Sequence, residues 1–167
     1  NNVSGAEYYS YDNLGRLSYN SFETFYRDTY TYVAGSSSDY TTGLVEKVTS
    51  TLGSTNTSVT YTYDDRGNII QESRSPGGVI YYTYDDLDQL IREDNSAIGK
   101  TYIYTYDKAG NILTKKVYSY TLAATPTTLL QSYTYSYGNS NWKDQLTSIN
   151  GNSITYDGIG NPLSYYN

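Results

Sequence analysis

At seven places along the chain, large side chains, mostly Tyr, alternate with the small polar side chains of Thr or Ser. Residues 59–63 read Val-Thr-Tyr-Thr-Tyr, with the large side chains at every second position. A period of two is typical of a β-strand that presents one set of side chains to each face, and Tyr and Thr both favour the pleated backbone. We therefore predict a strand at each of these places. No segment combines helical apolar spacing with helix caps, so no helix is predicted.

Turn signals follow five of these strands. Each strand ends in Asp, and in four copies Gly stands three residues after it. The Asp side chain can accept a hydrogen bond from the backbone N–H two residues on, which ends the strand, and Gly supplies the positive φ of the turn. In the fifth copy Asp88 stands where Gly is expected. Asp tolerates the left-handed region better than most residues, so we predict a strained but similar turn there.

The repeated residues form the candidate structural site. Two further copies, at 30–32 and 135–137, keep the Tyr triplet but lose the Asp. We assign strand and turn roles to the following residues: Tyr9, Tyr11, Asp12, Gly15, Tyr61, Tyr63, Asp64, Gly67, Tyr82, Tyr84, Asp85, Tyr104, Tyr106, Asp107, Gly110, Tyr156, Asp157 and Gly160.

The spacing of the triplets defines a repeat. Their last residues are 21, 31, 21, 22, 31 and 19 positions apart. After each Asp turn an apolar return segment follows, so one period corresponds to one β-hairpin. Periods of this size are typical of arrays in which each unit stacks on the next. We expect the two longer intervals to carry about ten extra residues in loops, where added length costs little closure entropy.

These units predict an all-β fold of tandem antiparallel β-hairpin repeats of about 21 residues. Residues 1–167 are expected to form a single repeat array of about seven hairpin units, which we interpret as a piece of a longer protein. About fourteen strands exceed the roughly ten that an open twisted sheet usually holds, so we expect the sheet to curl or spiral into a partial shell. A closed barrel fits poorly with such uneven periods.

Composition indicates an unusual interior. The chain has 24 Tyr but only two Phe and one Trp. A buried phenol needs a hydrogen-bond partner or water. We therefore expect Tyr to form ladders between neighbouring hairpins, with Thr on the other face. The single Trp, Trp142, lies in a longer loop and is a candidate ligand contact.

Charge and residue types exclude several function classes. Cysteine is absent, so disulfides and thiolate metal sites cannot form. The net charge of −6 argues against a nucleic-acid partner, and no run of about 20 apolar residues predicts a membrane span. The open edges of such a sheet predict edge-to-edge self-association.

Candidate chemistry is limited to carboxylates, because the chain has no His and no Cys. A glycosidase needs only two carboxylates, and the doublets 64–65 and 85–86 supply them. However, the Asp residues repeat with the period, which favours a turn role over a catalytic one. The acidic stretch 64–68 lacks the alternating ligands and distal Glu of an EF-hand. We therefore predict no enzyme activity, no cofactor and no metal site.

The pattern Tyr-x-Tyr-Asp-x-x-Gly-[Arg/Asn]-[Leu/Ile] resembles that of the Rhs or YD-repeat family, found in bacterial polymorphic toxins, wall-associated proteins and teneurins. Residues 11–17 and 106–112 fill every position of it. The resemblance implies a strip of β-hairpins that spirals into a hollow shell, which in the toxins encloses an effector polypeptide. It also implies a secreted or surface-displayed bacterial protein. The chain lacks the Asp-Pro dipeptide of the self-cleaving members, so we expect no autoproteolysis.

Two functions follow as alternatives. The first is a non-catalytic scaffold segment that encloses or presents an effector polypeptide of the same parent protein. The second is an adhesion module that binds carbohydrate or another cell-surface ligand through Tyr-rich faces. The aromatics stand just before each turn at a fixed register, which favours ladder-forming residues and hence the first alternative.

Overall fold

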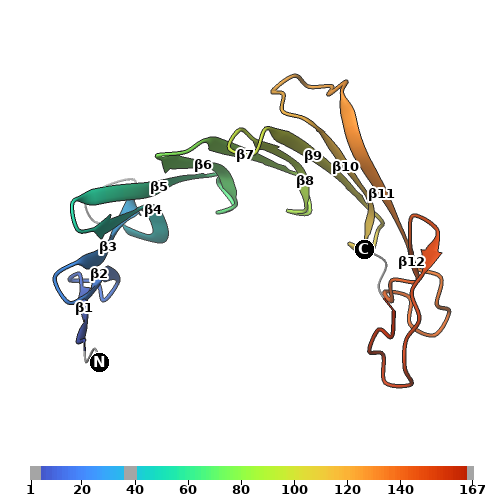
Figure 1. Cartoon of the computed structure of the whole chain (residues 1–167), viewed down its shortest axis with the longest axis horizontal. Helices are drawn as coiled ribbons and strands as arrows, with labels where there is room; N and C mark the ends of the chain where they lie inside the picture. Colours follow the sequence, from blue (N-terminus) through green and yellow to red (C-terminus); the bar gives the residue numbers. More distant parts are fainter. Residues whose placement is uncertain (1–4, 36–40, 165–167) are drawn as a thin grey trace. The chain divides into compact units, whose positions relative to one another are not determined.

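The computed structural model describes residues 5–35 and 41–164, and in this part the chain forms strands and turns but no helix (Figure 1). Consecutive strands are neighbours in a single 13-stranded sheet. The all-β prediction of antiparallel hairpins is thereby confirmed, and the sheet is open rather than closed into a barrel. The strands are β1 (Glu7–Tyr11), β2 (Leu17–Phe22), β3 (Tyr26–Ala34), β4 (Thr41–Leu52), β5 (Thr55–Tyr63), β6 (Ile69–Ser75), β7 (Val79–Tyr84), β8 (Leu90–Asn95), β9 (Lys100–Tyr106), β10 (Ile112–Ser119), β11 (Leu129–Ser136), β12 (Ser148–Ile149) and β13 (Asn152–Ser153).

The chain divides into two compact units, Asn1–Tyr81 and Tyr82–Asn167. The first contains β1 to β6 and the start of β7, and the second contains the end of β7 and all later strands. Each unit is built from hairpins alone. The organisation of residues 1–167 as one array of about seven units stays a prediction.

Each repeat begins with a strand that carries the Tyr triplet and continues with a return strand. Tyr11 lies opposite Leu17, and Tyr63 lies opposite Ile69. In both hairpins the register shifts just before the Tyr, as in a hairpin whose turn is closed by a bulge. The repeated turn therefore has the geometry that the Asp-x-x-Gly pattern predicts.

The two 31-residue intervals, from Tyr32 to Tyr63 and from Tyr106 to Tyr137, differ in where their extra residues lie. In the second, the extra residues form the connection 120–128 between β10 and β11, as predicted. In the first, most of them lengthen the strands: β4 and β5 have 12 and 9 residues, against 7 and 6 in β6 and β7. The prediction of a loop insertion is wrong there because a longer hairpin adds backbone hydrogen bonds along both strands. Residues 36–40 of this interval lie outside the described part.

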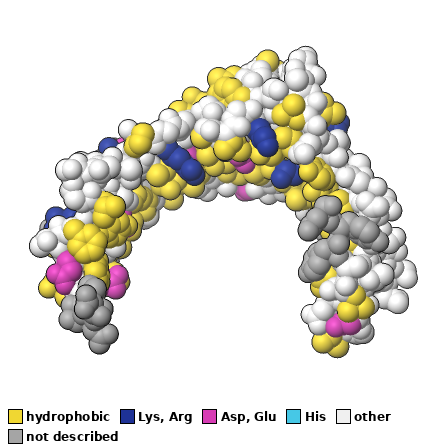
Figure 2. Space-filling model, viewed as in Figure 1, with side chains coloured by type: hydrophobic (Ala, Val, Ile, Leu, Met, Phe, Trp, Pro, Cys, Tyr) yellow, Lys and Arg dark blue, Asp and Glu magenta, His cyan; other side chains and the backbone are white. Residues whose placement is uncertain are grey.

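The two faces of the sheet differ in burial, as the alternation predicts. In β3, Tyr30 and Tyr32 are half-buried while Thr29 and Thr31 are exposed. Few side chains are buried deeply, and many large apolar side chains reach the surface, where Figure 2 shows them in yellow. No helix in the described part is long and apolar enough to cross a membrane. Within the described part of each unit, the Tyr face belongs to a single layer of strands.

Candidate functional site

The repeated turn is held together by its aspartate. In the copy after β9, Asp107 Oδ1 accepts the N–H groups of Ala109 at 2.8 Å and Asn111 at 3.0 Å. Its Oδ2 accepts the side-chain amide of Asn111 at 3.0 Å. The backbone closes the turn twice, because the Asp107 N–H donates to the Asn111 carbonyl and the Gly110 N–H donates to the Asp107 carbonyl. Both carboxylate oxygens are therefore used within the turn.

The same arrangement occurs in all five copies. Every Asp Oδ1 accepts the N–H groups two and four residues on, at 2.8 to 3.0 Å. Every Oδ2 accepts a side-chain donor four residues after the Asp. Sequence reasoning gave no role to this donor, although Asn or Arg after the Gly was part of the pattern. The five donors are Arg16, Asn68, Gln89, Asn111 and Asn161.

The backbone confirms the predicted turn at Asp88. The turn glycines 15, 67, 110 and 160 have φ between 76° and 91°, and Asp88 in the same position has φ 60°. The Asp88 N–H donates to the Asp85 carbonyl at 3.1 Å, as the glycines do in their own turns. A non-glycine residue with this φ carries backbone strain.

The turn hydrogen bonds stabilise the ionised aspartates. The side-chain amide of Asn111, together with backbone N–H groups, holds the pKa of Asp107 below its ordinary value of 3.8. Asn161 lowers the pKa of Asp157 in the same way. A low pKa caused by structural donors makes these carboxylates poor proton acceptors at neutral pH, which suits capping rather than acid–base chemistry.

In five of the seven triplets, the last Tyr connects one repeat to the preceding one. The Tyr106 hydroxyl in β9 donates to the Leu90 carbonyl at the start of β8, at 2.7 Å. We call such a bond a tyrosine rung. The other rungs are Tyr32 to Leu17, Tyr63 to Val45, Tyr137 to Ile112 and Tyr156 to Leu146. The predicted Tyr ladder thus consists of hydroxyl-to-carbonyl bonds, whose acceptors the sequence did not indicate.

The first Tyr has a different environment in three of the triplets, whereas the Tyr30 hydroxyl donates to Asn20 Oδ1 at 3.2 Å. The hydroxyls of Tyr61, Tyr104 and Tyr135 make no hydrogen bond to any residue in the described ranges. We call these three the free phenols. Burial, followed by the charge of Glu93, raises the pKa of Tyr104 to about 12, so this phenol stays protonated at neutral pH. Lys115 lies over the same face, with its Nζ 5.9 Å from the centre of the Tyr104 ring.

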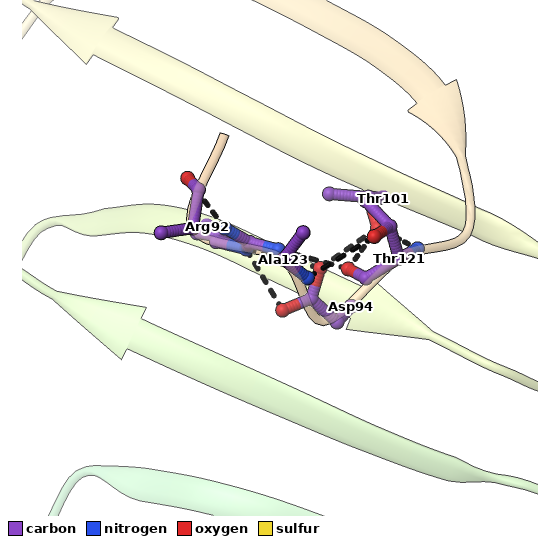
Figure 3. A network of polar contacts seen from close by, with 6 residues as sticks. Arg92, Asp94, Thr101, Thr121 and Ala123 are labelled. Carbon is purple, nitrogen blue, oxygen red and sulfur yellow. Dashed lines mark hydrogen bonds and ion pairs between the residues drawn. The ribbon is translucent and has the colours of Figure 1, made fainter. Parts of the chain in front are cut away.

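A second polar network fastens the connection 120–128 to the sheet (Figure 3). Arg92 Nε donates to Asp94 at 2.8 Å, and its Nη2 and Nη1 donate to the carbonyls of Thr121 and Ala124. The Thr101 hydroxyl, which is fully buried, lies 2.7 Å from Asp94 Oδ1. Sequence reasoning missed this network, since nothing in the repeat pattern pairs β8 with a distant loop.

Trp142 lies beside the last repeat turn. A Cβ atom on Gly160 would come 2.5 Å from the indole ring, so the ring and this turn are in contact. Trp142 is 53 % exposed and, with Tyr156 and Asp157, lines an open hollow of about 540 Å³. Its role as a ligand contact stays a prediction.

The turn aspartates belong to five separate turns, each satisfied locally. Among residues 5–35 and 41–164, no group of three or more His, Cys, Asp or Glu side chains is placed to hold a metal ion. What the repeated residues form is therefore a periodic network, with one Asp in each of the five turns and a Tyr rung in five of the seven triplets.

Comparison with known proteins agrees with this periodicity. The family model described as RHS Repeat matches residues 84–123, which run from the end of β7 into the connection 120–128. No curated protein matches the chain.

Similar solved structures come from toxin complexes. A crystal structure of TcdB2-TccC3-Cdc42 aligns with a TM-score of 0.67 and 19 % identity over 87 % of this chain and 7 % of its own. A Photorhabdus luminescens Tc holotoxin pore aligns at 0.65 and 17 %, over 95 % of this chain and 10 % of its own. A crystal structure of TcdB2-TccC3-TEV gives 0.63 and 16 %, over 92 % and 9 %. The chain shares their fold and spans about a tenth or less of their length.

Proposed function

The chain carries the Rhs repeat, and from this premise we propose that it is a non-catalytic segment of a β-shell that encloses or presents an effector polypeptide of its parent protein. The observation that carries the proposal is that the two Tyr hydroxyls of three triplets differ in their hydrogen bonding. In each of these three triplets one Tyr is used in a rung, while the free phenol, Tyr61, Tyr104 or Tyr135, keeps its hydroxyl available on the same face of its own strand.

Phenol hydroxyls suit contact with a partly unfolded polypeptide. Each hydroxyl can donate and accept a hydrogen bond, so it can pair with either backbone group of an extended chain. The rings add contact area, but their polar ends avoid the continuous apolar surface that would trap or aggregate cargo. Because the pKa of Tyr104 is raised to about 12, its hydroxyl stays protonated over the physiological pH range.

The proposed lack of catalysis rests on the aspartates. The carboxylates at 12, 64, 85, 107 and 157 each accept bonds from their own turn. A carboxylate that is fully satisfied by structural donors is a poor general base.

Capture of an unfolded polypeptide tests the proposal. The probe is a fluorescently labelled, carboxymethylated lactalbumin, which stays unfolded in buffer, and binding is followed by anisotropy and by protection from protease. The combined variant Tyr61→Phe, Tyr104→Phe, Tyr135→Phe is expected to weaken capture at least fivefold. The matched control carries Thr31→Val, Thr62→Val and Thr83→Val, at exposed positions of the opposite face. Equal digestion of the probe with and without the chain would count against the proposal.

Carbohydrate binding at Trp142 is the second candidate. The hollow beside Trp142 is lined by Asn139, Asn141 and Gln145, and an exposed indole with nearby amides is a suitable surface for a sugar ring. Because the chain has one Trp, its fluorescence reports on this place alone. A saturable shift on titration with oligosaccharides or glycosaminoglycans would favour an adhesion module. For either function we propose a secreted or surface-displayed protein.

A further inference from the structure

An open hollow of about 480 Å³ lies beside the turn that joins β2 to β3. Its volume is within the range typical of small-molecule pockets. In β3, Arg27 and Thr29 alternate with Tyr26 and Tyr30, so the Arg27 side chain lies on the face opposite the tyrosines of its own strand. The residues of the hollow that concern a ligand are Ser21, Glu23, Phe25 and Arg27, all in the first compact unit.

Arg27 brings a guanidinium without an acid partner to this hollow. Its Cζ lies 4.4 Å from the centre of the Tyr19 ring, which supports the planar group from one side. No carboxylate in the described part of the chain pairs with Arg27. The adjacent Asp28 belongs to the other face, where it accepts the hydroxyls of Tyr26 and Ser50. A guanidinium in this state suits a carboxylate, which it can bind through two parallel hydrogen bonds.

Ser21 supplies a second donor beside Arg27. The two residues lie directly opposite each other in the β2–β3 register, so their side chains are neighbours on one face. Ser21 is only 5 % exposed, yet its hydroxyl makes no hydrogen bond to any residue that the structure describes. A polar group buried to this extent normally has a partner. A ligand carboxylate held by Arg27 would supply one.

Phe25 and Glu23 define the rest of the ligand. The Phe25 ring is half exposed and is braced by Phe22, whose ring meets it edge-on with the centres 5.6 Å apart. It offers an apolar wall to a ring of the ligand. Glu23 Oε1 accepts the N–H of Ala6 at 3.1 Å, and no cation among the described residues pairs with this carboxylate. Glu23 therefore disfavours a second negative charge on the ligand and favours an N–H donor.

We propose that this hollow binds a single carboxylate carried on an aromatic body with one N–H donor, which is the chemistry of an N-acylated aromatic amino acid. Arg27 and Ser21 bind the carboxylate, Phe25 packs against the ring, and Glu23 accepts the N–H. This group occurs both as a free small molecule and as the C-terminal residue of a polypeptide. The site does not involve the free phenols, so it can fail or hold independently of cargo capture.

Two matched probes test the chemistry of the ligand. N-acetyl-L-phenylalanine carries all the required groups, and N-acetyl-L-phenylalaninamide lacks only the carboxylate. Each is titrated into the whole chain, and binding is followed by two-dimensional amide NMR. The acid is expected to cause saturable shifts at residues 21–29 and at the side-chain N–H of Arg27, whereas the amide is expected to bind at least tenfold more weakly, as loss of a charge-assisted pair requires. Equal binding of the two probes would overturn the proposal.

A longer probe distinguishes the two sources of the group. It is an acetylated peptide of three glycines followed by a C-terminal phenylalanine. Affinity equal to that of N-acetyl-L-phenylalanine assigns the hollow to a free small acid, and a higher affinity assigns it to the end of a polypeptide. Failure of both acids to bind would refute the site itself.

Substitutions test the residues. Arg27→Gln is expected to weaken binding of the acid about tenfold. Lys47→Gln removes an exposed cation from the same face of β4 and is expected to leave the affinity unchanged. Ser21→Ala is expected to weaken binding about threefold without lowering the melting temperature, because its hydroxyl bonds to no other residue. Undiminished binding by Arg27→Gln, or equal losses for Arg27→Gln and Lys47→Gln, would overturn the assignment.

Discussion

At the scale of single residues, each repeated aspartate accepts hydrogen bonds from its own turn. The type of residue at each position follows from local chemistry: Asp accepts backbone N–H groups, and Gly or Asp88 adopts positive φ. Sequence could therefore predict these roles. The acceptors of the tyrosine rungs could not be predicted, because a phenol can reach several carbonyls and only the strand register selects one.

Acid pH should destabilise the turns. The folded-state pKa of Asp107 and Asp157 is lowered by the amides of Asn111 and Asn161, so the ionised forms stabilise the fold above the ordinary value of 3.8. This contribution is lost as pH falls through the lowered folded-state values. We expect the variant Asp107→Asn, Asp157→Asn to be less stable at pH 7 and to lose less stability on acidification. Urea unfolding between pH 7 and 2.5 measures both effects. Asp65→Asn, at an exposed neighbour of a turn Asp, should follow the wild-type curve, and parallel curves for all variants would contradict this account.

Removal of backbone strain should stabilise the protein. Asp88→Gly relieves the backbone strain of the left-handed φ of 60°, but it also makes the unfolded chain more flexible. We expect a net gain of about 0.5 kcal/mol in the free energy of unfolding. Thermal unfolding measures it as a small rise in melting temperature. Asp86→Gly, in the same turn but outside the positive-φ positions, is expected to lower it. A fall in melting temperature for Asp88→Gly would refute the turn assignment.

At the scale of secondary-structure elements, the molecule consists of hairpins and the connections between them. Alternation and turn residues predicted where strands lie, because both are local properties of the sequence. They did not distinguish a longer hairpin at β4 and β5 from a loop insertion, since Thr and Ser suit either. The Arg92 network was beyond prediction because it joins β8 to a connection about thirty residues away.

Loss of the Arg92 network should release the connection 120–128. Arg92→Leu leaves Asp94, whose side chain is 9 % exposed, without its cationic partner, and we expect a loss of about 2 kcal/mol in unfolding free energy. Arg74→Leu removes the pair with Glu72, in which Arg74 is 51 % exposed and Glu72 is 12 % exposed, and should cost less than Arg92→Leu because the cation is solvated. Hydrogen exchange should also become faster in residues 120–128 for Arg92→Leu alone. Similar losses for the two variants would show that the network does not fasten the connection.

At the scale of the whole molecule, we propose a repeat scaffold whose triplet strands carry two sets of tyrosines. The rungs couple successive hairpins, and the free phenols are the surface that we propose for cargo. Sequence periodicity predicted the scaffold because identical residues at equal spacing cannot all form one active site. It did not separate the two sets, since both have the same residue type and alternate on the same strands.

The most direct measurement is a comparison of two triple variants in two assays. The rung variant carries Tyr63→Phe, Tyr106→Phe and Tyr137→Phe, and the phenol variant carries Phe at positions 61, 104 and 135 of the same repeats. Urea unfolding and capture of the labelled unfolded polypeptide are measured for both. We predict that the rung variant loses about 1 kcal/mol per hydroxyl and still captures the probe, whereas the phenol variant keeps its stability and loses capture. Equal losses of stability in the two variants, with capture unchanged in both, would contradict the account.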